Sequence, residues 1–126
     1  MKAFALLAAT VLICVGCIDH VRHSKEQVLR EDLFTLRQSI DQFTQDQKRA
    51  PQSLEELVSY RYLQHIPSDP FTNSPVTWQL IYSDPVQTPQ DTPASPPSGI
   101  RKLKSIIDVR SGSDQTAADG TRYKDW

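Results

Sequence analysis

Apolar residues fall on one face of a predicted helix in the first half of the chain. From Ser24 to Gln47 there is no Gly or Pro. Within that range the apolar side chains recur every three or four residues, at Leu29, Leu33, Leu36, Ile40 and Phe43. This spacing predicts an amphipathic helix whose stripe packs against the rest of its domain. Most of the other positions are charged or amide residues, so we expect the opposite face to be solvated.

An uncharged run of 16 residues, Ala3 to Ile18, precedes this helix and follows Lys2. A transmembrane helix needs roughly 18 to 25 apolar residues, and the apolar region of a signal peptide about 7 to 15. The run therefore predicts that residues 1–18 form a retained single-pass anchor, or else an export signal. A second interpretation is a lipoprotein signal ending in Val15-Gly16-Cys17, with Cys17 acylated after cleavage.

The apolar run and the amphipathic stripe can belong to one helix, since only Gly16 interrupts the helical pattern between Ala3 and Gln47. Such a helix of about 45 residues would be near 68 Å long at about 1.5 Å per residue. One half would serve lipid or neighbouring chains and the other a small domain, which is the geometry of a packing subunit. The alternative is an ordinary amphipathic helix behind a cleaved signal.

The chain after residue 48 predicts one short helix. Pro51 ends the long helix, and Ser53 with Glu56 three residues later has the pattern of a capping box. We expect this helix to run to about Tyr60 and to pack on the stripe through its apolar side chains.

Two strands are predicted beyond it, at 76–82, where apolar and polar residues alternate, and at 104–110. Between them, residues 83–98 hold five of the nine prolines and predict an exposed loop. Residues 111–126 are rich in turn formers and predict a C-terminal loop. The expected fold is α+β, with a long N-terminal helix on a short helix and a small antiparallel sheet.

The composition of the chain limits the classes of function that it can have. The 14 Lys and Arg against 15 Asp and Glu give a formal net charge of −1, which does not favour nucleic acid as a partner. From residue 19 onward only about 31% of residues are apolar, below the share in typical globular domains. The core must be small, and no phosphate loop, paired zinc ligands or nucleophile motif is found. We therefore do not expect an enzyme.

Several segments together resemble the major pseudopilin of type II secretion systems, within the type IV pilin-like family. The resemblance covers about residues 28 to 126. It runs through Arg30-Glu31-Asp32-Leu33, Ile40-Asp41-Gln42-Phe43, Asp46 and Pro51, Ser53-Leu54-Glu55-Glu56-Leu57, Tyr62-Leu63, Ile66-Pro67, Asp69-Pro70-Phe71 and Asp108-Val109-Arg110-Ser111-Gly112-Ser113-Asp114. Their order and spacing follow the family, so the resemblance implies a pilin-like fold.

The resemblance implies a structural role in protein secretion. The chain would be a non-catalytic subunit that assembles through its N-terminal helix into a homo-polymer, or a minor component of one. Its partners would be other pseudopilin subunits and the secretion machinery. Its location would be the bacterial inner membrane, as a single-pass protein with residues 19–126 forming a periplasmic domain and residues 19–48 its long helix.

The N-terminus departs from the family pattern. The sequence has neither a Gly-Phe-Thr style cleavage site nor a Glu at the fifth position after one. Prepilin peptidase is therefore not expected to recognise it. A start codon placed too late, a diverged subunit and a re-anchored pilin-derived domain are competing explanations. The last includes the alternative function of an exported lipoprotein or binding module that keeps the fold and does not polymerise.

The C-terminal loop is a candidate calcium site. Asp114, Asp119 and Asp125 lie among turn-forming residues, and calcium prefers six to eight oxygen ligands. The family's C-terminal loop holds structural calcium, and by resemblance Asp114 matches best, followed by Asp125 and then Asp119. The competing interpretation is that these carboxylates cap local turns.

Overall fold

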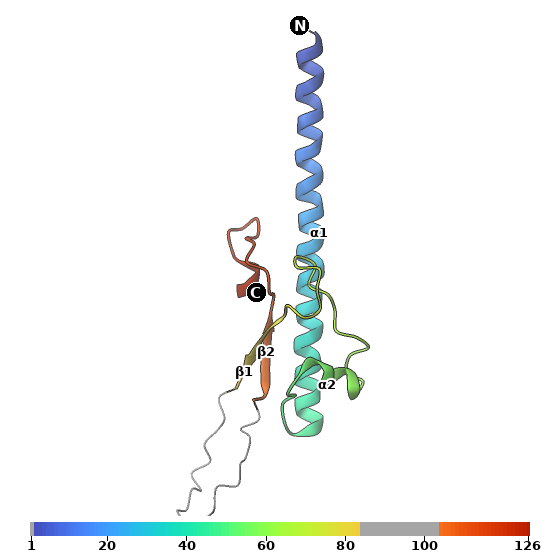
Figure 1. The fold of residues 1–126 in the computed structure, drawn as a ribbon, viewed down its shortest axis with the longest axis vertical. Coiled ribbons are helices and arrows are strands. Elements are labelled where there is room, and N and C mark those ends of the chain that lie inside the picture. Colours follow the sequence, from blue (N-terminus) through green and yellow to red (C-terminus); the bar gives the residue numbers. More distant parts are fainter. Residues whose placement is uncertain (1, 84–103) are drawn as a thin grey trace, which may run out of the picture.

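The other elements of the fold pack along one long helix. The computed structural model describes residues 2–83 and 104–126, with side chains described from Ile18 onward in the first helix. Figure 1 shows the long helix with the remaining elements gathered along its second half. The elements in chain order are α1 (Lys2–Gln47), α2 (Leu54–Ser59), β1 (Gln79–Tyr82), β2 (Ile106–Arg110) and the 3-10 helix η1 (Tyr123–Asp125).

Helix α1 is continuous over 46 residues, or about 69 Å at about 1.5 Å per residue. Gly16 does not interrupt it. It ends at Gln47, and Lys48 then adopts a left-handed conformation with φ of 55° before the chain reaches Pro51. The N-terminal half projects beyond all the other described elements (Figure 1). We call residues 24–83 and 104–126 the head.

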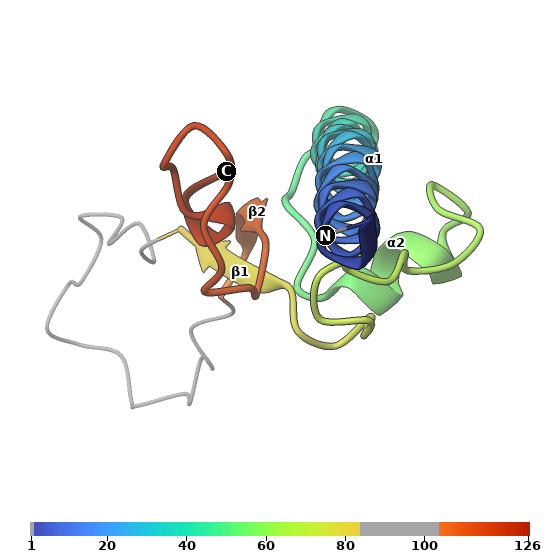
Figure 2. The same cartoon turned by 90° about the horizontal axis from the view of Figure 1, so that it is seen from above.

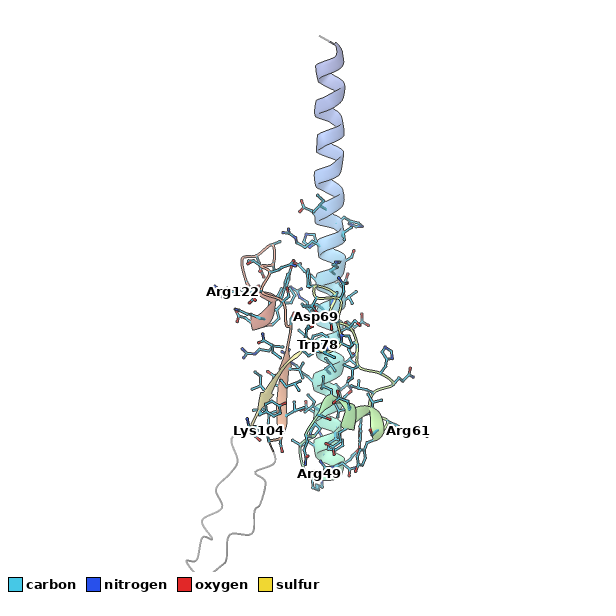
Figure 3. The ribbon with its side chains drawn as sticks, viewed as in Figure 1. Arg49, Arg61, Asp69, Trp78, Lys104 and Arg122 are labelled. Atoms are coloured by element: carbon cyan, nitrogen blue, oxygen red, sulfur yellow. The ribbon has the colours of Figure 1, made fainter. Side chains whose placement is uncertain are left out.

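The core of the head lies between α1, α2 and β2. All five stripe residues of α1 are buried, as are Leu54 and Leu57 of α2 and Ile106 and Val109 of β2. Trp78 is also buried, and its indole Nε1 donates to the Pro67 carbonyl at 2.8 Å. Figure 3 shows Trp78 in the interior of the head. The remaining buried apolar residues are Leu63, Ala117 and Tyr123.

Helix α2 begins where the sequence predicts. Ser53 is the N-cap, and its Oγ accepts from the Glu56 backbone N at 3.3 Å. The Glu56 carboxylate accepts from the Gln52 backbone N at 2.8 Å and also pairs with Arg49. The short helix is thus held at its first turn, and the chain before it is tied to the end of α1.

The two strands pair antiparallel, with Leu80 opposite Val109, and both are shorter than predicted. The first was expected from residue 76 and begins at Gln79. Residues 74–77 instead form a turn in which Thr77 Oγ1 donates to the Ser74 carbonyl at 3.2 Å, and Val76 is 85% exposed. The alternation of side chains at 76–78 therefore reflects this turn and the buried Trp78. The predicted loop at 83–98 lies almost entirely outside the described residues.

The sequence predicts a membrane anchor or an export signal at residues 1–18. Among the residues that the structure describes, no helix contains a stretch both long enough and apolar enough to cross a membrane.

Replacing Leu36 with Asp should destabilise the head. The side chain of Leu36 is fully buried on α1, and an unpaired carboxylate there should lower the free energy of unfolding by at least about 3 kcal/mol. Urea unfolding followed by tryptophan fluorescence measures this loss. Gln38→Asp, at an exposed position of the same helix, is the control. Equal stability of the two variants would contradict the assignment of the stripe to the core.

Candidate functional site

A buried carboxylate joins two distant loops of the head. Asp69 is fully buried, and its Oδ1 accepts from the backbone N of Phe71 at 2.9 Å and of Thr72 at 3.4 Å. Its Oδ2 accepts from Ser111 Oγ at 2.6 Å and from the Gly112 backbone N at 3.1 Å. Figure 3 labels Asp69 in the interior beside α1. One side chain therefore fixes the chain just after β2 against the loop that precedes β1.

The backbone around Asp69 closes tightly. The Asn73 backbone N donates to the Asp69 carbonyl at 2.7 Å, and Asn73 has a φ of 53°, which Asn tolerates better than most residues. At Gly112 a Cβ atom would lie 2.0 Å from the Thr77 carbonyl oxygen. Only glycine allows these two loops to approach so closely, and this approach sets the direction of the segment that follows.

The C-terminal segment, residues 111–126, then crosses to the upper part of the head and docks on α1 through Tyr123. The Tyr123 hydroxyl donates to Glu26 Oε1 at 2.8 Å, and both side chains are buried. Its ring stacks on Phe71 with 3.9 Å between centroids. Burial, followed by the bond to the Glu26 carboxylate, raises the pKa of Tyr123 to about 12. His23 Nδ1 lies 3.6 Å from Glu26 Oε2.

Two arginines of α1 hold the end of β2 and the C-terminal residue Trp126. Arg37 donates from Nε to Asp108 Oδ1 at 2.7 Å, and from Nη2 to the carbonyl oxygens of Val109 and Trp126, both at 2.9 Å. The Arg30 guanidinium lies 4.5 Å from the centre of the Trp126 ring, in cation–π geometry. A planar guanidinium suits this role because it presents several donors in fixed directions.

Between α1 and the C-terminal segment lies an open groove of about 460 Å³. Phe34 stands at its rim and is 66% exposed, a large apolar surface for an aromatic side chain. The groove combines two aromatic rings, two guanidinium groups and one carboxylate, which suits binding of a protein surface better than catalysis. It is lined by Arg30, Leu33, Phe34, Arg37, Asp119, Thr121 and Trp126.

The three aspartates expected to bind calcium are not brought together. Asp114 Oδ1 pairs with Lys124 Nζ at 2.7 Å, and this bond lowers the pKa of Asp114. Asp119 Oδ1 accepts from the backbone N of Thr121 at 2.9 Å and from its Oγ1 at 2.6 Å, and these bonds lower the pKa of Asp119. Asp125 lies in η1.

Within residues 2–83 and 104–126 no three His, Cys, Asp or Glu side chains are grouped to hold a metal. The local capping that competed with calcium describes Asp119 well. As arranged, these carboxylates do not form a ligand set, and calcium binding stays a prediction.

The other candidate residues separate into two groups. Leu29, Leu33, Leu36, Ile40 and Phe43 all lie in the core, where they hold the head on α1. The side chain of Cys17, the candidate lipidation site, lies outside the described side chains.

Three residues that organise the site were not found from the sequence. From the sequence, Asp69 stands only within the segments that carry the family resemblance, and Glu26 and Arg37 are among the charged positions of a face expected to be solvated. A polar residue beside an apolar stripe is a weak sign of burial, and at Glu26 its partner is 97 residues away.

No protein-family model, curated protein or solved structure gives a significant match to this chain. Any functional conclusion therefore depends on the residues and geometry described above.

Replacing Asp69 with Asn should loosen both loops. The amide would offer one acceptor atom where four donors converge, so we expect the free energy of unfolding to fall by about 2–4 kcal/mol. Urea unfolding measures the change, and Asp41→Asn at an exposed position of α1 should cost less than about 0.5 kcal/mol. A loss at Asp69 no larger than that of the control would show that this carboxylate does not organise the head.

Replacing Tyr123 with Phe should change how stability depends on alkaline pH. Because the pKa of Tyr123 is raised from 10.0 to about 12, the folded chain keeps a proton that the unfolded chain releases near pH 10. Its stabilisation is present below pH 10 and is lost as pH rises through about 12. We expect the urea midpoint of the natural chain to fall between about pH 9 and about pH 11.5 more than that of the variant. Parallel curves would contradict this role.

Proposed function

We propose that the chain is a non-catalytic, pseudopilin-like structural subunit of a type II secretion or type IV pilus-like machine, which assembles through its N-terminal helix. The observation that supports this most is the shape of α1. The core stripe of α1 lies between Leu29 and Phe43, and the N-terminal half of the helix projects beyond the head (Figure 1).

The projecting half needs a partner on energetic grounds. A helix with no tertiary contacts is marginal in water, because most helical stability in proteins comes from packing of an apolar face. On this half, Ile18 is 62% exposed and Val21 is 56% exposed. Val28, where α1 enters the head, is 47% exposed. Packing against the same helix of neighbouring subunits would cover such side chains.

The head suits a structural role as well. Its buried polar contacts, from Asp69 and Glu26, hold the C-terminal segment rather than converge on a cavity. The groove beside Phe34 is open and is lined by both apolar and charged side chains. These features support a surface for assembly more than a site for chemistry.

The proposed location is the inner membrane with the head in the periplasm. The competing function is an exported lipoprotein that keeps this fold and does not polymerise, and the triplet Val15-Gly16-Cys17 favours it. The state of the N-terminus separates the two functions, because the cleavage that exposes Cys17 for lipidation would remove residues 1–16, which include the first 15 residues of α1.

Extraction of the native protein from membranes should therefore give a free or methylated N-terminus by intact mass, at or upstream of the apolar run. A photo-crosslinking residue at Val21 should give a ladder of multiples of the chain mass, since neighbouring helices would contact this position. The same residue at Gln52, exposed near the far end of α1, is the control and should give a much weaker ladder. A diacylated Cys17 with no ladder would favour the lipoprotein and leave the pilin likeness as one of fold.

A further inference from the structure

Phe34 is an exposed aromatic residue with basic neighbours. It directly follows the core residue Leu33 on α1 and therefore lies about 100° around the helix from it. Arg30 and Arg37 lie one turn away on either side of it. Burial of an aromatic ring is strongly favourable, yet no described part of the head covers most of this ring.

A second apolar groove, of about 440 Å³, lies on the α2 side of the head. Its apolar lining consists of Val58, Ile66, Pro75 and Val76, and Glu55 lies among its polar lining residues. Val76 is 85% exposed, while Val58 and Ile66 pack against the core. The groove has the size and apolar lining to receive an aromatic side chain.

The two features lie on different flanks of one molecule, so a chain cannot fill its own groove. Phe34 lines the opening shared with Trp126 of the C-terminal segment. Thr35, about 100° further around the helix, lines a cavity shared with Leu63 and His65. Figure 2, which looks down α1, shows the C-terminal segment and α2 on opposite sides.

The charges on the two flanks are complementary. The Arg30 guanidinium contacts the Trp126 ring and forms no salt bridge with any described residue. On this flank lies the Asp119 carboxylate, whose pKa is lowered first by its bonds from Thr121 and further by the charge of Arg30. Glu55, in the first turn of α2, likewise has no salt bridge within the described part of the chain. A basic side chain thus accompanies the aromatic ring, and an acidic one lies beside the groove.

We propose that Phe34 of one copy of this chain inserts into the groove formed by Val58, Ile66, Pro75 and Val76 of the next copy, with Arg30 facing Glu55. This inference rests on the proposed assembly function and names its head-to-head contact surface. The contact joins two different patches, so each copy keeps one free ring and one free groove. Such a heterologous contact repeats along a filament unless the rotation closes a ring.

Two variants test the contact, one on each side of it. Phe34→Ser removes the ring, and Val76→Asp places a carboxylate in the groove beside Glu55. Both positions are exposed, so circular dichroism and thermal unfolding should match those of the natural chain. Ile107→Ser, at a position on β2 that is 54% exposed and outside both patches, is the matched control.

The full chain in detergent micelles is then crosslinked and its oligomers are sized by mass. Each variant by itself should lose at least about nine-tenths of the crosslinked oligomers, a tenfold change that corresponds to about 1.4 kcal/mol. An equal mixture of the two variants should form dimers and nothing larger, because the intact ring of one fits the intact groove of the other. Ile107→Ser should assemble as the natural chain does.

Charge reversal supplies an independent measurement. Arg30→Glu and Glu55→Arg should each weaken assembly, and the double variant should restore it if the two side chains face one another. A photo-crosslinker at position 34 should label the peptide containing residues 55–76 of a second copy.

The proposal is overturned if Phe34→Ser and Val76→Asp assemble normally, if the mixture gives no dimer, or if the label at position 34 falls elsewhere or on no other copy. Failure here is distinct from failure of the proposed function. A ladder from Val21 together with no label from position 34 on a second copy would leave the helix-driven assembly intact and reject only this contact.

Discussion

The buried carboxylate of Asp69 is the constraint on which the rest of the head depends. A carboxylate in a protein interior is costly to desolvate unless donors surround it, and here four donors from two loops converge on its two oxygens. Because Ser111 and Gly112 lie immediately after β2, the carboxylate determines where the C-terminal segment starts. The close approach of Gly112 to Thr77 then restricts the direction in which this segment can continue. A chain with few apolar residues thus uses a polar contact where larger domains use a deeper core.

The C-terminal segment in turn depends on α1 being one continuous helix. Glu26 accepts a hydrogen bond from Tyr123, and three turns later Arg37 donates to Asp108 and to Trp126. These contacts are spaced along about 16 Å of helix axis, so a kink between them would break one or the other. The C-terminal segment can therefore make both contacts only while α1 is continuous, and α1 in turn determines where along its length the segment docks. The open groove beside Phe34 lies between α1 and this segment, which contacts α1 through Tyr123 and Trp126.

Local signals in the sequence predicted local structure well. The stripe from Leu29 to Phe43 and the cap at Ser53 depend on residues a few positions apart, which periodicity and capping rules can read. The site depends on pairs such as Asp69 with Ser111 and Glu26 with Tyr123, which only the tertiary fold brings together. The strand predicted from residue 76 is too long at its start, because the alternation of apolar and polar residues there runs through a turn that ends before β1. Calcium binding stays a prediction, and of its three candidate aspartates Asp119 accepts locally from Thr121.

The two surfaces proposed for assembly have different roles. The projecting half of α1 would supply affinity, and the contact of Phe34 with the groove would set the register. Apolar packing along the projecting half of α1 is roughly proportional to buried area and has little directionality, so by itself it would allow neighbouring helices to slide. Insertion of a single ring into a groove, accompanied by opposite charges, permits one orientation only, because charge complementarity contributes more to specificity than to affinity. Since Phe34 lies on the same rigid helix as the projecting half, a register fixed at the head is transmitted along α1 to the helix packing. The continuity of α1 would therefore matter for assembly as much as for the stability of the head.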